Sequence, residues 1–176
     1  MEEIKVLIIE DHNLTRIGLK AALQTREDIK IVGEAANATE GLKLLQILRP
    51  DVATVDIGLP DFDGIELTSK YRELQSQNEE YQTKLLVLTM QSNEDAVLAA
   101  LGAGADSYCM KDIESEKLID AIVQTNEGNS WIDPTIADVV LRQIRVETEA
   151  QQSGNGGGNT KTISIEAVDS EIEKVI

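Results

Sequence analysis

Short apolar runs and longer amphipathic stretches alternate five times along the first 127 residues. The runs are rich in Val, Ile and Leu and are bounded by charged or turn-forming residues, a pattern typical of strands covered on both faces. The runs occupy residues 4–9, 29–32, 52–55, 85–88 and, more weakly, 107–110. The stretches between them repeat apolar residues at helical spacing. Five strand–helix units predict an α/β domain over residues 1–127, with a parallel sheet, right-handed crossovers and helices on both faces.

The pattern changes after Gly128. Asp133 followed by Pro134 is typical of a helix start, and apolar residues then recur at helical spacing, so we expect an extra helix within residues 128–146. Residues 147–162 include a glycine-rich segment and predict a flexible linker. Beyond it, an apolar stripe predicts that residues 163–176 begin a further helix, whose packing partner, an output domain, lies outside the chain.

Composition and charge narrow the functional classes. The chain has 32 acidic and 16 basic residues, a formal charge of -16, and only five aromatic side chains (one Trp, three Tyr, one Phe). Binding of DNA, RNA or an anionic membrane by residues 1–176 themselves is therefore not expected, because phosphate groups attract basic surfaces. The single Cys109 excludes an intrachain disulfide, and neither a secretion signal nor a membrane-length apolar stretch is present. We expect a cytoplasmic protein.

Polar residues follow the predicted strands at the end where parallel sheets bind ligands. Glu10 and Asp11 follow the first strand, Asp56 follows the third, Thr89 ends the fourth, and the fifth runs into Lys111. Because the carboxyl ends of parallel strands meet at one edge of the sheet, we expect three carboxylates, a hydroxyl and an ammonium group to converge there.

Three carboxylates in one place repel one another, by about 4 kcal/mol for each close pair at an effective dielectric constant near 20. A hard divalent cation relieves this repulsion, and Mg²⁺ prefers carboxylate and carbonyl oxygens and often bridges to phosphate. With Mg²⁺ present, Asp56 can act as an ionised nucleophile, while Lys111 and Thr89 hold phosphoryl oxygens. The sequence therefore predicts phosphoryl transfer to Asp56, giving an aspartyl phosphate.

Four motifs, spread over residues 4–127, resemble the receiver domain of bacterial two-component response regulators. They are "VLIIEDH", "DVATVDIGLPDFDG", "LLVLTM" and "GADSYCMKD". The segments "EDHNLTRIGLKAAL" and "GNSWIDPTIADVVL" are similar to the NarL/FixJ (LuxR-type) subfamily, whose members usually carry a C-terminal helix-turn-helix. The resemblance implies a flavodoxin-like doubly wound sheet of order 2-1-3-4-5 with five helices, to which the extra C-terminal helix and tail are added.

The resemblance also implies the roles of the site residues. Asp56 would accept a phosphoryl group from the phosphohistidine of a sensor histidine kinase, and Thr89 and Tyr108 would form a conformational switch. Mg²⁺ would be held by Glu10, Asp11, Asp56 and the backbone carbonyl of Gly58. The domain would catalyse only its own phosphorylation and dephosphorylation, and its partners would be the kinase, a possible second copy and, through a full-length parent protein, DNA.

Some positions depart from the family pattern. Glu10 stands where Asp is commoner, and Asp112 replaces a frequent Pro after Lys111, which leaves the isomer of that peptide bond open. Met90 is bulky enough to shield a phosphoryl group from water. Trp131 is expected to pack the extra helix onto the domain.

Other functions remain open at this point. A receiver-like module that docks partners without phosphorylation would need none of the acidic pair, the acceptor and the lysine, yet all are present. A flavodoxin-like or cobalamin-binding domain is disfavoured because no glycine-rich phosphate loop follows the first strand. Tyr108 can also be interpreted without a role in the switch, as a half-buried tyrosine whose hydroxyl is hydrated. His12 is more simply interpreted as a solvated residue at a helix start than as a catalytic group.

Overall fold

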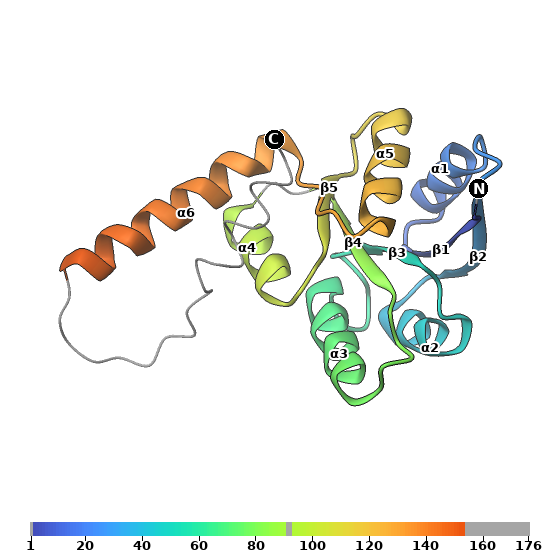
Figure 1. The fold of residues 1–176 in the computed structure, drawn as a ribbon. Coiled ribbons are helices and arrows are strands. Elements are labelled where there is room, and N and C mark those ends of the chain that lie inside the picture. Colours follow the sequence, from blue (N-terminus) through green and yellow to red (C-terminus); the bar gives the residue numbers. More distant parts are fainter. Residues whose placement is uncertain (1, 91–92, 154–176) are drawn as a thin grey trace.

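Five parallel strands form the central sheet in the order β2-β1-β3-β4-β5 (Figure 1). The computed structural model describes residues 2–90 and 93–153. The strands are β1 (Ile4–Ile9), β2 (Ile29–Ala35), β3 (Val52–Asp56), β4 (Lys84–Thr89) and β5 (Ser107–Met110). The predicted doubly wound fold and its strand order are confirmed.

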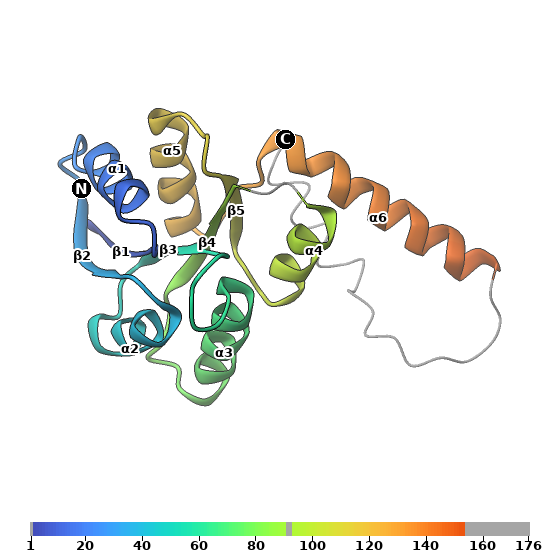
Figure 2. The same cartoon turned by 180° about the vertical axis from the view of Figure 1, so that it is seen from behind.

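Helices cover both faces of the sheet (Figures 1 and 2). They are α1 (Asn13–Leu23), α2 (Ala38–Leu48), α3 (Gly64–Gln77), α4 (Glu94–Gly102), α5 (Ser115–Asn126) and α6 (Pro134–Ser153). Helices α1 and α5 lie on one face, α2 and α3 lie on the other, and α4 lies beside β5. None of the helices in the described ranges is long and apolar enough to cross a membrane.

Alternation along β1 shows why an unbroken apolar run suits this fold. Val6 and Ile8 belong to the core formed with α1 and α5, whereas Leu7 and Ile9 belong to the core formed with α2 and α3. All four are buried. Because successive side chains of a strand point to opposite faces, a strand between two helical layers must be apolar at every position.

Helix α6 is longer than the sequence pattern predicted. Asp133 begins it by accepting hydrogen bonds from the main-chain N–H of Thr135, at 3.0 Å, and from the Thr135 hydroxyl, at 2.8 Å. The helix continues to Ser153 instead of ending at residue 146, so residues 147–153 of the expected linker are helical. These residues are Glu, Thr, Ala, Gln and Ser, with no Gly or Pro to stop a helix before Gly154. The rest of the linker and residues 163–176 lie outside the described residues.

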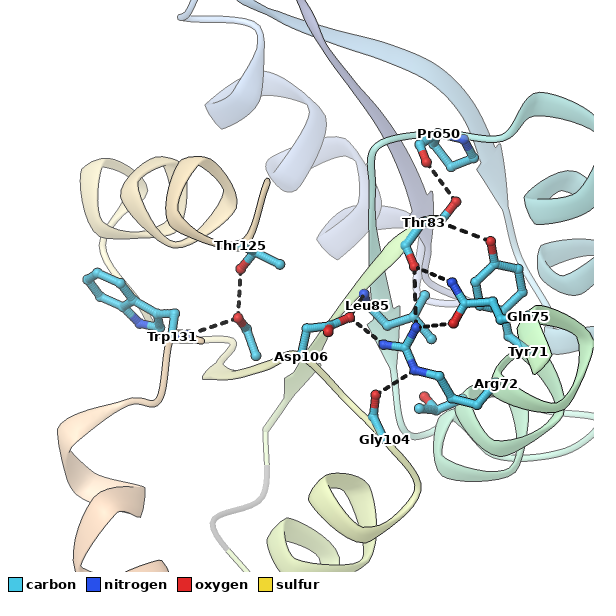
Figure 3. Close-up of polar contacts among 12 residues, drawn as sticks. Pro50, Tyr71, Arg72, Gln75, Thr83, Leu85, Gly104, Asp106, Thr125 and Trp131 are labelled. Atoms are coloured by element: carbon cyan, nitrogen blue, oxygen red, sulfur yellow. Dashed lines mark hydrogen bonds and ion pairs between the residues drawn. The ribbon is translucent and has the colours of Figure 1, made fainter. Parts of the chain in front are cut away.

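The segment before α6, residues 131–133, extends the sheet beyond β5, and we call it the edge segment. The N–H of Tyr108 donates to the carbonyl of Trp131 at 2.8 Å, and the N–H of Asp133 donates to the carbonyl of Tyr108 at 3.1 Å. Figure 3 shows Trp131 beside Thr125, to which it is linked through the hydroxyl of Ser107.

The expectation that Trp131 packs α6 onto the domain is wrong. Its indole packs against the core formed with α1 and α5. Ile132, Ile136 and Val140 instead join α6 to a third core cluster that includes Val87. Neighbouring residues of an extended segment point to opposite sides, so Trp131 and Ile132 serve different layers.

At the amino ends of β4 and β5, an ion pair joins Arg72 of α3 to Asp106 (Figure 3). Arg72 Nε also donates to the carbonyl of Gly104 at 2.7 Å, and Asp106 accepts the N–H of Leu85 at 2.7 Å. Gly104 has φ of 99°, a conformation that favours glycine. We call this group the Arg72 cluster; it ties α3 to the start of two strands.

Candidate functional site

Asp56 stands at the carboxyl end of β3, in a strand that is buried at every position. The N–H of Gly58 donates to Asp56 Oδ1 at 3.2 Å. Gly64, the first residue of α3, packs directly on the acceptor backbone, since a Cβ built there would lie 2.1 Å from the Asp56 carbonyl oxygen. Only glycine fits this approach, which places the start of α3 immediately behind Asp56.

Lys111 reaches the same point from the end of β5. Its N–H donates to the carbonyl of Thr89 at 2.8 Å, which continues the pairing between β4 and β5. Its Nζ lies 2.9 Å from Asp56 Oδ1 and 2.6 Å from Glu10 Oε2. Burial opposes the charged ammonium, but the contacts with Glu10 and Asp56 outweigh it and raise the pKa of Lys111. The lysine therefore remains a cation.

The acidic pair after β1 divides into a buried and an exposed member. Glu10 is 1 % exposed, while Asp11 is exposed. The N–H of His12 donates to Glu10 Oε1 at 3.1 Å, and Arg16 Nη1 donates to the Glu10 carbonyl at 2.8 Å. Burial and the charge of Asp56 raise the pKa of Glu10 above 4.5, although the contact with Lys111 acts in the opposite direction.

These carboxylates fit a divalent cation. Glu10, Asp11 and Asp56 each offer an oxygen, and the three oxygens lie within 4.8 Å of one another. Three ionised carboxylates and one ammonium leave a local charge of -3 + 1 = -2, which a divalent ion neutralises. The donors are hard oxygens, as Mg²⁺ requires. The structure thus brings together the predicted side-chain ligands, and Gly58 lies two residues after Asp56 in the chain.

Thr89 and Tyr108 form a buried pair at the ends of β4 and β5. Thr89 is 4 % exposed and Tyr108 is fully buried, which does not match the half-buried alternative for this tyrosine. Burial raises the pKa of Tyr108, and its side-chain hydrogen bond with Thr89 only partly offsets this. Tyr108 shares its core cluster with Val97 of α4 and Ile136 of α6. Thr89 and Tyr108 therefore connect the carboxylate edge with both helices.

The structure also bears on three smaller expectations. Met90 is 72 % exposed, and the expected shielding of a phosphoryl group by its side chain stays a prediction. His12 caps α1, where a ring nitrogen accepts the N–H of Thr15 at 3.4 Å, and it is exposed as the solvated interpretation predicted. No peptide bond among the described residues is cis, so the Lys111–Asp112 bond is trans.

Asp61, in the loop after β3, makes a long-range contact with α2 that was not predicted from the sequence. Its carboxylate accepts hydrogen bonds from the N–H groups of Ala38 and Thr39, both at 2.8 Å. No spacing in the sequence signals this contact, because Asp61 lies in the loop after β3 and its partners, 23 and 22 positions away, lie at the start of α2.

The fold, the strand-end carboxylates and the lysine define a phosphotransfer signalling domain, and comparison with known proteins identifies the family. A model of the response regulator receiver domain matches residues 6–123, well over half of the chain. The chain belongs to this family.

Its relatives confirm the NarL/FixJ, LuxR-type subfamily. The chain is 36 % identical over 143 residues to the transcriptional regulatory protein LiaR of Bacillus subtilis, covering 81 % of this chain but only 65 % of LiaR. It is also 36 % identical over 146 residues to the response regulator protein VraR of Staphylococcus aureus, covering 83 % of this chain and 68 % of VraR.

Solved structures agree with these relatives. A LuxR-family two-component response regulator from Aurantimonas sp. SI85-9A1 superimposes with a TM-score of 0.74 at 28 % identity, covering 82 % of this chain and 99 % of that one. The receiver domain of the putative response regulator NarL from Mycobacterium tuberculosis gives a TM-score of 0.68 at 28 % identity, covering 73 % of this chain and all of that one.

Proposed function

We propose that this receiver domain accepts a phosphoryl group on Asp56 from the phosphohistidine of a sensor histidine kinase, with Mg²⁺ held by Glu10, Asp11, Asp56 and the carbonyl of Gly58. The observation that carries the proposal is the contact of Lys111 Nζ with Asp56 Oδ1 at 2.9 Å, beside carboxylate oxygens that lie within 4.8 Å of one another. The proposed nucleophile, its cationic partner and the proposed metal ligands thus lie at one edge of the sheet.

The chemistry follows from these groups. An oxygen of Asp56 attacks phosphorus in line, the bond between phosphorus and the imidazole nitrogen breaks, and the imidazole leaves with the electron pair. Lys111 and the Thr89 hydroxyl donate hydrogen bonds to the phosphoryl oxygens, where charge accumulates. Bound Mg²⁺ supplies neutralisation of charge on these oxygens. The domain in this proposal catalyses only its own phosphorylation and the hydrolysis that reverses it.

The kinase requires a surface beside the acceptor, and α1 supports this part of the proposal. The helix begins two residues after Asp11 and exposes Leu14 and Ile17, which are 73 % and 54 % accessible. Exposed apolar residues that lie together on a helix mark a protein interaction surface. A cytoplasmic location fits both a kinase partner and the single, buried Cys109.

The output of the switch is proposed to be transcription, through a helix-turn-helix domain of a longer protein and with possible receiver dimers. LiaR, a transcriptional regulatory protein, supports this by similarity, and the chain spans 65 % of its length. Thr89 and Tyr108 are the proposed switch. If the Thr89 hydroxyl turns to the phosphoryl group, its hydrogen bond with Tyr108 is lost, which alters the packing of Tyr108 beneath α4 and α6.

Incubation with acetyl phosphate and Mg²⁺ tests the acceptor. We expect one acid-labile phosphoryl group per chain by intact mass, and none in Asp56→Asn. Asp51→Asn is the matched control, because Asp51 lies just before the opposite end of the same strand, where it accepts the N–H of Lys5. A label retained in Asp56→Asn would exclude this acceptor. A wild-type chain that takes no label with acetyl phosphate or a kinase would favour a docking module independent of phosphorylation.

A further inference from the structure

The loop between β3 and α3, residues 57–63, is held in place by a helix that is distant in the sequence. We call it the acceptor loop, since it directly follows Asp56 and contains Gly58. The first three N–H groups of a helix have no partner inside it and need an outside acceptor. In α2, Asn37 Oδ1 accepts the third of these groups, that of Glu40, at 2.8 Å.

The other two groups are satisfied from the acceptor loop. The N–H of Ala38 donates to Asp61 Oδ1 and the N–H of Thr39 donates to Asp61 Oδ2, both at 2.8 Å. The Thr39 hydroxyl donates a further hydrogen bond to the same carboxylate. The hydrogen bond from Thr39 is the main cause of a strongly lowered pKa of Asp61, so this carboxylate is ionised at neutral pH. The negative charge also faces the positive end of the α2 dipole.

This contact restrains the main chain that follows the acceptor. On one side of Asp61, the side chain of Leu59 is buried in the core between the sheet and α2 and α3. On the other side, the N–H of Gly64 donates to the carbonyl of Ile57 at 3.0 Å and closes the loop. Gly58 lies between Ile57 and Leu59, the two residues of the loop that these contacts hold, and it is exposed.

We propose that Asp61 is a positioning residue for the Mg²⁺ site, because it docks the acceptor loop on the start of α2 and thereby fixes the carbonyl of Gly58. The inference rests on the proposed function. Among the proposed ligands, the Gly58 carbonyl is the one that comes from a loop instead of a side chain at a strand end. Its position depends on how the acceptor loop is held.

The Mg²⁺ dependence of labelling by acetyl phosphate tests this role. We expect Asp61→Ala to raise the Mg²⁺ concentration for half-maximal labelling about tenfold, the lower end of the effect of removing outer-shell partners of metal ligands. The maximal rate at saturating Mg²⁺ should be unchanged, because Asp56, Lys111 and Thr89 are intact. A loss of maximal rate without a change in Mg²⁺ dependence would contradict the proposal.

Two controls separate positioning from helix stability and from charge. Asn37→Ala removes the remaining α2 cap and lowers the melting temperature, but it leaves the acceptor loop attached, so its Mg²⁺ dependence should equal that of wild type. Thr39→Val preserves the net charge and removes one hydrogen bond to Asp61, so it should shift the Mg²⁺ dependence in the same direction by a smaller factor, whereas Thr39→Ser should not. Equal shifts in Asn37→Ala and Asp61→Ala, or no shift in Thr39→Val, would overturn the inference.

A direct titration with Mg²⁺ alone, in which calorimetry measures the binding, keeps this test separate from phosphorylation. Weaker binding in Asp61→Ala and Thr39→Val supports the positioning role even if the wild-type chain takes no phosphoryl group. Equal Mg²⁺ affinity in wild type and both variants overturns it even if Asp56 is the acceptor.

Discussion

Two charged clusters occupy opposite ends of the sheet, and their composition differs. At the amino ends of β4 and β5, one guanidinium meets one carboxylate, and main-chain groups and the Gln75 side chain take the remaining hydrogen bonds. At the carboxyl ends, one ammonium contacts the carboxylates of Glu10 and Asp56, and the carboxylate of Asp11 lies beside these two. The Lys111 side chain is 9 % exposed, whereas that of Arg72 is 25 % exposed. The more buried cluster is therefore the one with unbalanced charge.

This difference in charge separates a cluster that stabilises the fold from a cluster that can bind a cation. A charged cluster whose charges balance and whose polar atoms are paired stabilises the fold and needs no ligand. A buried cluster with excess negative charge weakens the folded state until a cation binds. The Arg72 cluster should therefore respond to mutation and not to Mg²⁺, while the cluster around Lys111 should respond to both.

The largest loss of stability is expected from a substitution in the Arg72 cluster, whose charges balance. Arg72→Met leaves Asp106 without its cation and the Gly104 carbonyl without its donor, so the free energy of unfolding should fall by about 2–3 kcal/mol. Urea unfolding with and without Mg²⁺ measures this, and the stabilisation by Mg²⁺ should be the same as in wild type. The exposed pair of Arg49 and Glu80 is the control, since Arg49→Met should cost at most about 0.5 kcal/mol. Equal losses in the two variants would remove the distinction between the Arg72 cluster and an ordinary surface ion pair.

A smaller loss is expected for Gly104→Ala. The residue has φ of 99°, and an added Cβ would lie 2.9 Å from Cγ of Arg72. The strained backbone and the displaced side chain together should lower the free energy of unfolding by about 1–2 kcal/mol. Gly18→Ala is the matched control within α1, where no atom lies within 4 Å of the new Cβ, and it should stabilise by about 0.5–1 kcal/mol. Thermal or urea unfolding measures both changes. A Gly104→Ala variant more stable than wild type would contradict the close packing of Gly104 on Arg72.

In the cluster around Lys111, removing a charge is expected to raise the free energy of unfolding instead of lowering it. Folding raises the pKa of Glu10 above its value of 4.5 through burial and the charge of Asp56. The stability that this shift contributes is complete below pH 4.5 and is lost as pH rises through the folded pKa, because the unfolded chain releases the proton first. Glu10→Gln stays neutral, so at pH 7 without divalent ions it should be more stable than wild type, and this advantage should disappear near pH 4.

Urea unfolding in a chelator, across this pH range, measures the difference. Saturating Mg²⁺ should stabilise wild type more than Glu10→Gln, because the ion needs the carboxylate. A variant that is less stable than wild type at pH 7, with chelator present, would show that the contact between Glu10 and Lys111 outweighs the cost of burying the charge.

The sequence was sufficient for the sheet and for the side chains at its carboxyl edge. Strand periodicity places Glu10, Asp56 and Lys111 at the ends of parallel strands, and topology alone then brings them together. Contacts that depend on loop paths were not predictable, which applies to Asp61 on α2 and to the pairing of Arg72 with Asp106, 34 positions apart. These are ordinary charged residues in no recurrent pattern.

Errors in the sequence-based predictions have equally local reasons. The end of α6 was placed too early because apolar spacing fades after residue 146, although Glu, Ala and Gln continue a helix readily. The contacts of Trp131 depended on which side of the extended edge segment faces α5, and a single aromatic residue does not reveal this side.

Helix α6 is long enough that a small movement at the sheet edge would become a large one at its far end. Its 20 residues span about 30 Å, and it starts directly after the edge segment that is hydrogen-bonded to Tyr108. Figures 1 and 2 show it running away from the sheet. A tilt of about 10° at its base moves the far end by about 5 Å, comparable to one helical turn. A change in the hydrogen bonds between Tyr108 and the edge segment would therefore displace the end of α6 at Ser153 much further than Tyr108 itself.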